Sequence, residues 1–502
     1  MDYYEEYSDY LNQFIENDYV DVMDNEDNYD VFNDCVFPTL NDGINKFLAP
    51  IVVSNVILKF VTLFINKLIV KQLLTIATGL LLLFYHFYDD LKLFVILCAF
   101  ISTGAVMSLM SAKHKTKLWM FSIGLICINE SIVWLNPHFI RLRSHQMLLV
   151  MKIISFNSMI NQMQDNSGKD LPIIGSLISS LNYILHPLSS LLGVWHPFEV
   201  EKTNKSLKIA IIECIYYLLI SVMFLLLSTC LIHYYIGQRF ISYIVISLTA
   251  LLPLTFIYLI EICLTVYITA LQFRFSHYFI CFATQSMLQL WNSDIGVTNV
   301  MSIEMPRSLV SVVIAWNIPM HLWLHSNVFL PSKRSFGAFK AIFITYIISS
   351  FLHGFNFQIW SVLLSLGLLT KIEYELRQEL SKIFSACIHV RRCHYKELST
   401  NGTTHETNKY QSIIKFWNFL SFKSKRKVCD NKWHHRYTEY NCKWVSVVNI
   451  LFACLAVSHL AYLGSTFDGK EESSFVSNVI SVWSELKYFS HITALITFII
   501  YF

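Results

Sequence analysis

Long apolar runs alternate with short polar segments along the chain. Runs that approach or exceed membrane-spanning length cover residues 50–68, 71–87, 92–111, 117–135, 207–235, 240–272, 309–330, 338–358, 359–385, 445–466 and 488–502. A helix needs about 20 predominantly apolar residues to cross the hydrocarbon core of a bilayer. The pattern therefore predicts an all-α polytopic membrane protein with about eleven transmembrane helices.

Two shorter apolar stretches, 147–160 and 172–195, differ from these runs; the second contains Pro172 and Pro187. Such interruptions predict re-entrant or broken helices, which a membrane protein tolerates only where the backbone is shielded by protein or lines a cavity. Composition agrees with the membrane interpretation, because 54% of residues are hydrophobic, 15% are charged and the mean hydropathy is +0.48. A soluble protein carries about a quarter charged residues.

The charge is distributed unevenly along the chain. The first 42 residues hold 13 of the 35 Asp and Glu residues, and residues 1–45 contain no Lys or Arg. A signal peptide would begin with basic residues, so none is expected. The acidic, Tyr- and Asn-rich composition predicts a disordered tail over residues 1–46, or alternatively an acidic partner-binding motif. Residues 47–502 are expected to form the transmembrane domain.

The longest polar loop covers residues 388–443 and carries 12 Lys and Arg against four acidic residues. By the positive-inside rule this basic insertion is expected to be cytosolic, and its run SFKSKRK could also contact anionic membrane lipids. Asn401 begins a glycosylation sequon, which a cytosolic loop would leave unmodified.

The 12 cysteines show no spacing typical of a disulfide framework or a zinc site. Cys230, like most of the others, lies in an apolar run and is expected to act as a small hydrophobic residue. We therefore expect no bound metal and no permanently bound cofactor, and nothing in the chain indicates a nucleic-acid partner.

A histidine lies in the middle of one membrane-length run. No residue between Lys340 and Lys371 carries a formal charge, yet the polar residue His353 lies near the middle of this stretch. On a continuous helix Ser349, Ser350, His353 and Asn356 would share one face. A polar face of this kind is expected to line a cavity or contact other helices rather than lipid.

A second polar residue, Asn317, follows Trp316 within the preceding run, and Pro319 interrupts the helix two positions later. Proline frees a carbonyl and kinks a helix, which can direct a side chain into a cavity. The polar turn Pro331–Arg334 joins this span to the one carrying His353. Antiparallel packing across that turn would bring the two polar residues to similar depth.

The pair has the chemistry of an acyl-transfer centre. A histidine shielded from water is kept neutral and can take the proton of a hydroxyl as it attacks a carbonyl. An asparagine amide can donate a hydrogen bond to the oxygen that becomes negative. The residue types alone leave a structural alternative open, in which His353 only bonds a neighbouring helix.

Several long motifs resemble the membrane-bound O-acyltransferases. They include EMPRSLVSVVIAWNIPMHLWL from residue 304, SSFLHGFNFQIWSVLLSLG from residue 349, AVSHLAYLGSTFD from residue 456 and WSELKYFSH from residue 483. The match is with the members that attach palmitoleate to a serine of Wnt proteins, and it covers roughly residues 50–502 in order. The acidic tail and the insertion at 395–443 have no counterpart in it.

The resemblance implies a helical bundle with a central tunnel in the endoplasmic reticulum membrane. His353 matches the family's catalytic histidine and Asn317 the second catalytic position. Palmitoleoyl-CoA would enter as acyl donor from the cytosol and a Wnt protein as acceptor from the lumen. Further candidate substrate-binding residues, each of which could instead serve helix packing or mark an interface, are Trp316, Trp323, Ser349, Ser350, Phe357 and Arg307.

Two other functions remain open from the sequence. The first is a related acyltransferase that acts on another peptide or a lysophospholipid. The second is a transporter or receptor whose intramembrane histidine binds a ligand without chemistry, although no internal repeat typical of transporters is visible.

Overall fold

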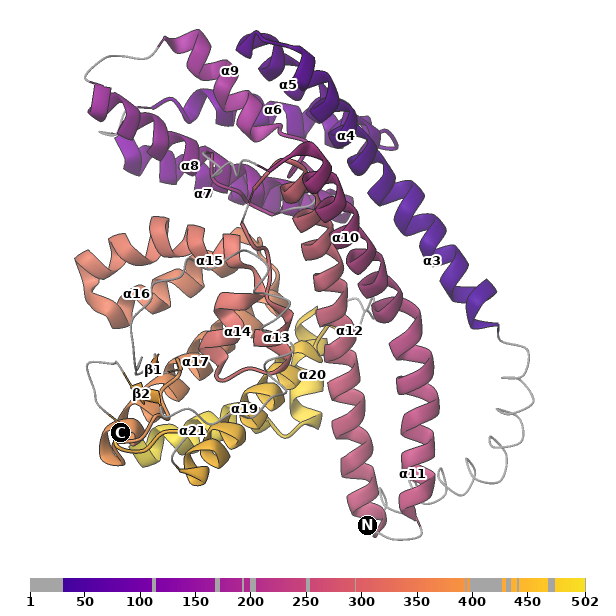
Figure 1. Cartoon of the computed structure of the whole chain (residues 1–502), viewed down its shortest axis with the longest axis vertical. Helices are drawn as coiled ribbons and strands as arrows, with labels where there is room; N and C mark the ends of the chain where they lie inside the picture. The colour runs from indigo at the N-terminus through magenta and orange to yellow at the C-terminus, as the bar shows by residue number, and fades with distance from the viewer. Residues whose placement is uncertain are drawn as a thin grey trace. The chain divides into compact units, whose positions relative to one another are not determined.

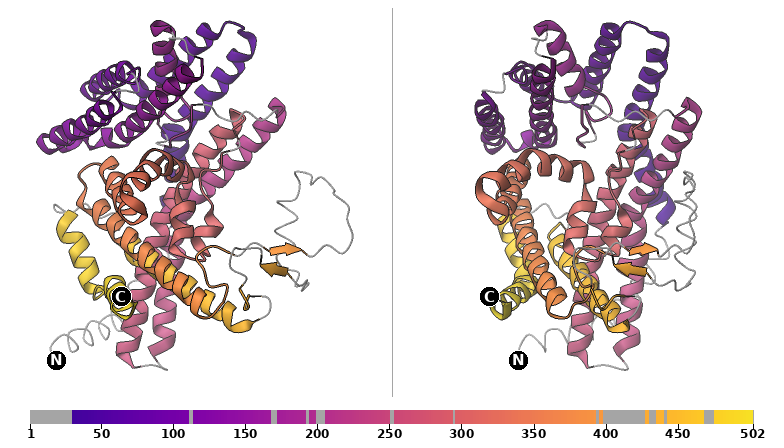
Figure 2. Two further views of the ribbon diagram at one scale, coloured as in Figure 1. Left: turned by 90° about the vertical axis from the view of Figure 1, so that its left-hand side faces the viewer. Right: turned by 60° about the vertical axis from the view of Figure 1, so that its left-hand side comes forward.

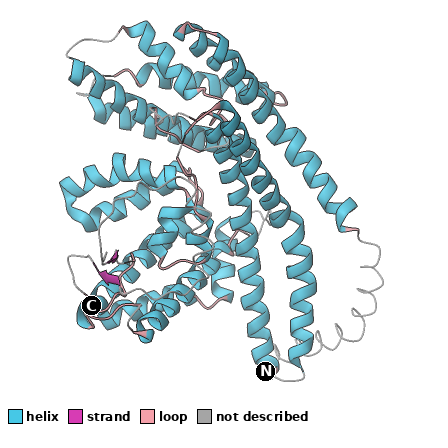
Figure 3. Ribbon diagram, in the orientation of Figure 1, coloured by secondary structure: helices cyan, strands magenta, loops and turns pink. Residues whose placement is uncertain are grey.

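The computed structural model describes residues 30–110, 114–167, 172–191, 194–198, 205–249, 253–293, 295–392, 395–397, 427–429, 435–439, 442–467 and 475–501. Helices make up most of this part of the chain (Figure 3). The only strands among the described residues are β1 (Tyr395–Glu397) and β2 (Lys427–Cys429). The fold is that of an all-helical polytopic membrane protein, as the apolar pattern predicts.

The chain forms two compact units, and helix α8 (Arg143–Ser167) contributes to both. The first unit contains residues 1–113, 152–193 and 197–295. Within it, α10 (Leu207–Leu226) and α12 (Leu254–Leu290) pack along each other (Figure 1). Its other elements are α3 (Phe37–Asn41), α4 (Ala49–Phe64), α5 (Leu68–His86), α6 (Leu91–Met107), α9 (Ile173–Ile184), α11 (Ile241–Thr249) and the π-helical segments Phe32–Val36, Asp42–Leu48 and Leu227–Phe240.

The second unit contains residues 114–151, 194–196 and 296–502. Its elements are α7 (Lys115–Leu135), a 3-10 helix (Pro137–Leu142), α13 (Val300–Glu304), α14 (Leu309–Trp316), α15 (Ile318–Leu324), a π-helical segment (His325–Phe329), α16 (Leu330–Leu352), α17 (Phe357–Ile383), β1, β2, α19 (Lys443–Gly464), α20 (Phe475–Glu485) and α21 (Phe489–Tyr501). α17 packs against α14, α16, α19, α20 and α21. Leu309, Leu369, Tyr462 and Trp483 belong to the hydrophobic core that these helices share.

Among the described residues, seven helical stretches are long and apolar enough to cross a membrane. They are Phe32–Phe64, Leu68–His86, Lys115–Leu135, Leu207–Gly237, Phe256–Leu290, Ile318–Leu352 and Lys443–Gly464. Three shorter apolar helices accompany them, at Leu91–Met107, Ile173–Ile184 and Phe489–Ile499. The run expected at 359–385 is helical as α17, but its second half carries charged residues and it does not meet this criterion.

The N-terminal boundary differs from the expected one. Helical structure begins at Phe32 and continues through residue 46, where the sequence predicts the end of a disordered tail. Composition is a poor guide here because the last part of the acidic segment contains apolar residues, and this part of the chain packs against α10 through α3. Residues 1–29, on which the rest of the tail prediction rests, lie outside the described residues.

The structure also corrects the expectation that Cys230 acts as a small hydrophobic residue. Cys35 and Cys230 form a disulfide that links residues 195 positions apart, so Cys230 is not a free apolar side chain. Cys387, at the start of the basic insertion, is disulfide-bonded as well. Disulfides persist in oxidising compartments, which favours the luminal side for this end of the insertion, whereas the positive-inside rule favours the cytosol. Orientation of the 388–443 segment therefore stays a prediction.

Both ends of the basic insertion are held by backbone pairing. The Cys387 N–H donates to Tyr437 O at 2.8 Å, and the Tyr437 N–H donates to Ser385 O at 3.1 Å. β1 and β2 pair as antiparallel strands within the insertion (Figure 2). Residues 398–426, which connect the two strands and include Asn401, lie outside the described residues.

Candidate active site

His353 lies at a break between two helices, not on a continuous helical face. α16 ends at Leu352, His353 is its C-cap residue, and Gly354 has a φ of +79°. Because only glycine adopts a positive φ at little cost, this residue lets the helix end here. α17 then starts after Asn356, whose Oδ1 accepts a hydrogen bond from Ile359 N at 3.2 Å.

This break corrects the expectation that four polar residues share one helix face. Ser349 and Ser350 are buried in the last turn of α16, and the Ser350 hydroxyl donates to Tyr346 O at 2.9 Å. Asn356 belongs to the next helix as its N-cap. The sequence contains the signals for this arrangement, since a Gly follows one helix and an Asn precedes the next.

The backbone next to His353 is held by two polar side chains, Trp360 and Glu130. Trp360 donates its indole N–H to Gly354 O at 2.7 Å. Glu130, on α7, accepts from Phe355 N at 3.0 Å and forms a two-pronged ion pair with Arg143. The His353 ring itself is half-buried, and neither of its nitrogens has a hydrogen-bond partner among the described residues. The break is thus rigidly supported while the imidazole is left available.

Asn317 also lies at a helix break, between α14 and α15. Its Oδ1 accepts a hydrogen bond from Met320 N at 3.0 Å and so caps α15, and Pro319 occupies the first turn of that helix. Proline is compatible with a first turn, so the chain starts a new helix here instead of kinking an existing one. With the oxygen used as a cap, the Nδ2 amide remains a donor without a partner in the described part of the chain.

A neighbouring segment holds this second break in place. Ile318 N donates to Val297 O at 2.9 Å, while Ala315 O accepts from Asn299 N at 3.1 Å and from the Thr298 hydroxyl at 2.9 Å. The carbonyl and N–H that the broken helix leaves open are therefore satisfied. Broken helices of this kind present polar side chains inside a membrane protein without exposing backbone to lipid.

The connection between the two breaks differs from the expected turn. Pro331–Arg334 is helical as the start of α16, and the chain turns at Gly337, which has φ +80° and ψ 169°. Pro331 lies where the π-helical segment His325–Phe329 continues into α16. α16 packs against α17, as does α14, so both breaks belong to helices that share α17 as a neighbour.

The other aromatic candidate residues differ in how deeply they are buried. Trp323 is fully buried, and its indole donates to Met151 O at 3.1 Å. Trp316 is half-buried at the end of α14, whereas Phe357 is 43% exposed at the start of α17. Trp323 therefore packs inside the bundle, and Trp316 and Phe357 remain candidate pocket residues.

Each guanidinium nitrogen of Arg307 has a partner within the protein. It donates to His389 O at 2.9 Å and Cys387 O at 2.8 Å, and it pairs with Glu439. These contacts join the start of α14 to residues 387–389 and Glu439, and a substrate-binding role for Arg307 stays a prediction. The neighbouring Arg377 is fully buried and completes the network, donating to Ile388 O at 2.8 Å.

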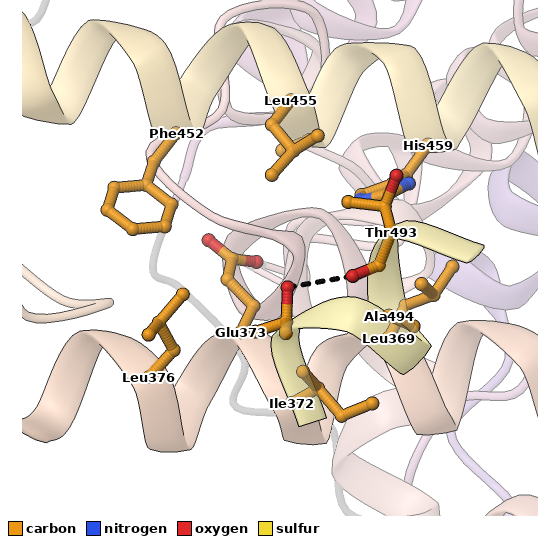
Figure 4. Close-up of a pocket in the computed structure, with 11 residues that line it drawn as sticks. Leu369, Ile372, Glu373, Leu376, Phe452, Leu455, His459, Thr493 and Ala494 are labelled. Carbon is orange, nitrogen blue, oxygen red and sulfur yellow. Dashed lines mark hydrogen bonds between the residues drawn. The ribbon is translucent and has the colours of Figure 1, made fainter. Parts of the chain in front are cut away.

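A small cavity lies between α17, α19 and α21 (Figure 4). Its walls are mostly apolar, and its charged or titratable side chains are Glu373 and His459. Glu373 accepts from Leu309 N at 2.8 Å, and His459 shares a hydrogen bond of 2.8 Å with the Ser490 hydroxyl. Neither His353 nor Asn317 lines this cavity, and its two titratable groups serve contacts between elements.

Sequence reasoning missed Glu130, Arg143 and Trp360. Glu130 is a single carboxylate within the apolar run 117–135, and an ionisable residue in such a run usually has a specific partner. No cluster of three or more His, Cys, Asp and Glu side chains in the described ranges could hold a metal ion.

Comparison with known proteins gives one consistent result. No family model matches the chain. The protein-serine O-palmitoleoyltransferase porcupine of Anopheles gambiae is 28% identical over 94% of this chain and 93% of its own length. The protein of the same name from Homo sapiens is 25% identical over 91% of this chain and 94% of its own. A third, from Caenorhabditis briggsae, is 31% identical over 40% of this chain and 38% of its own. Over more than nine-tenths of its length, this polytopic chain is thus similar to acyltransferases named protein-serine O-palmitoleoyltransferase porcupine.

Proposed function

We propose that the protein is a protein-serine O-palmitoleoyltransferase, which transfers palmitoleate from palmitoleoyl-CoA to a serine of Wnt proteins in the endoplasmic reticulum membrane. The observation that carries the proposal is the similarity to porcupine proteins over nearly the full chain. Two supported helix breaks within that similar region, each presenting an uncharged polar side chain, are consistent with it.

In the proposed reaction His353 takes the proton of the acceptor serine as its oxygen attacks the thioester carbonyl. The carbonyl oxygen becomes negative in the tetrahedral intermediate and accepts a hydrogen bond from Asn317 Nδ2. The carbon–sulfur bond then breaks, and the coenzyme A sulfur leaves with the proton held by His353. The serine ester and free coenzyme A are the products, so no metal or permanently bound cofactor is required.

Each residue is suited to its role by its present contacts. A general base needs a nitrogen free to accept a proton, and the His353 ring makes no competing hydrogen bond in the described structure. An oxyanion donor must be fixed in advance, and Asn317 is held by its own Oδ1 cap and by the backbone contacts of residues 297–299. We propose that a tunnel brings the acyl donor and the protein acceptor to these residues from opposite sides of the membrane.

The test is acyl transfer by the purified protein, given palmitoleoyl-CoA and a Wnt-derived peptide that contains the acceptor serine. We expect a mass increase of the peptide equal to one palmitoleoyl group, and none with the serine replaced by alanine. A lysophospholipid serves as the competing acceptor. Transfer to the lipid alone would contradict the proposed substrate class, and absence of any transfer would favour a transporter or receptor.

A further inference from the structure

The strongest unexplained feature of the second unit is the buried ion pair of Glu130 and Arg143. The Glu130 side chain is 4% exposed and that of Arg143 is 18% exposed. Arg143 Nε donates to Oε1 at 2.7 Å and Nη2 donates to Oε2 at 2.5 Å. Such two-pronged pairs fix the relative orientation of both side chains. Neither residue is needed for the proton transfer described above.

The carboxylate is aimed at the backbone that follows His353. Glu130 Oε2 accepts a hydrogen bond from Phe355 N at 3.0 Å. This N–H lies at the break between α16 and α17, where no helical carbonyl is available to accept it. The charged oxygen therefore replaces the missing helical partner.

Gly354 shows how closely the carboxylate approaches. A Cβ atom built on Gly354 would lie 2.3 Å from Glu130 Oε1 and 3.1 Å from Arg143 Nε. No real Cβ tolerates the first of these distances, so a side chain at this position would displace the carboxylate. The positive φ of Gly354 and the absence of a Cβ are both required for the ion pair to contact the break.

We propose that Glu130 and Arg143 are positioning residues for His353. Arg143 holds the Glu130 carboxylate, the carboxylate holds the Phe355 N–H, and the backbone at residues 354–355 then fixes the direction of the adjacent imidazole. The inference rests on the proposed role of His353 as general base. A displacement of about 1 Å at a reacting group can lower a rate about 100-fold, so support of this kind affects turnover directly.

The first experiment compares Glu130→Gln with Arg143→Lys. Both variants keep the approximate side-chain size but lose the two-pronged pair. We expect kcat for palmitoleoyl transfer to fall about 10- to 100-fold while KM for palmitoleoyl-CoA stays within about twofold. Glu375→Gln is the matched control, because it breaks a partly exposed ion pair with Lys371 on α17. It should leave both constants unchanged.

The exchanged pair Glu130→Arg with Arg143→Glu separates positioning from stability. It can restore an ion pair, but it places a guanidinium donor where the Phe355 N–H needs an acceptor. We expect the melting temperature to recover relative to Glu130→Arg alone, while kcat stays low. Recovery of both would show that the pair only stabilises the fold and would overturn the proposal. If the exchanged protein does not fold, hydrogen exchange of the Phe355 amide in the single variants still tests the positioning role.

Hydrogen exchange of the Phe355 amide provides a result independent of acyl transfer. We expect this amide to exchange at least about tenfold faster in Glu130→Gln than in the wild-type protein or in Glu375→Gln, because a neutral amide is a weaker acceptor. Unchanged exchange together with unchanged kcat would contradict the positioning role. If the Phe355 amide exchanges faster in Glu130→Gln but the wild-type protein transfers no acyl group, the support of the break by Glu130 stands and the proposed function is refuted.

Discussion

Replacement of His353 by alanine is expected to lower palmitoleoyl transfer about 10²- to 10⁴-fold, the usual contribution of a general base. His353→Gln should lower the transfer rate as much as His353→Ala does, because an amide can form hydrogen bonds but cannot take the serine proton. Transfer rates per folded molecule check this result, with a melting temperature in detergent to confirm that each variant folds. The ring makes no hydrogen bond to the described residues, so its loss should change the melting temperature little.

A second intramembrane histidine provides the control. His459 is buried and shares its hydrogen bond with Ser490, which is the pattern of a contact between helices. His459→Ala is therefore expected to lower the melting temperature and to keep the turnover of the folded protein. If His353→Ala retained more than a tenth of the wild-type rate, His353 could not be the base.

The second large effect is expected from Asn317→Asp. Aspartate keeps an oxygen that can cap α15, but it loses the Nδ2 donor and places a negative charge beside the developing oxyanion. Loss of one oxyanion donor typically lowers kcat about 10²- to 10³-fold. We expect the kcat of Asn317→Asp to fall by at least this factor, while its melting temperature stays near that of the wild-type protein.

Asn317→Ala should lose turnover and stability together, because it removes the cap as well as the donor; a lost cap costs about 1 kcal/mol. Asn299→Asp is the matched control, since Asn299 caps α13 through its own Oδ1, which accepts from Ser302 N at 3.2 Å. Asn299→Asp should leave both turnover and melting temperature nearly unchanged. Activity retained in Asn317→Asp would reduce Asn317 to a helix cap.

The sequence was sufficient to single out two candidate residues for a site, for a physical reason. Asn317 and His353 are polar groups in apolar runs, and a membrane protein retains such groups only where they have a partner or a task. Pro319 predicted an interruption next to Asn317, but the helix break after His353 was not predicted, because residues 349–356 were treated as one continuous helix. Gly354, Asn356 and Pro319 act at helix ends, and only their combination shows that the runs are interrupted.

Contacts between distant segments account for the remaining differences. Glu130 binds the backbone at Phe355, which is 225 residues away, and the Trp323 indole binds Met151 O, 172 residues away. No local pattern specifies such partners. Trp323 therefore looked like a pocket residue from its position beside Asn317, and the role of Glu130 was visible only as an isolated charge in an apolar run.

The most direct test of the account is a structure of the protein with a non-hydrolysable palmitoleoyl-CoA analogue. We expect the carbonyl that replaces the thioester to accept a hydrogen bond from Asn317 Nδ2, with a His353 ring nitrogen facing the position where the serine oxygen would attack. An analogue bound away from both residues, or an Asn317 and His353 too far apart to contact one carbonyl group and its attacking oxygen, would contradict the account.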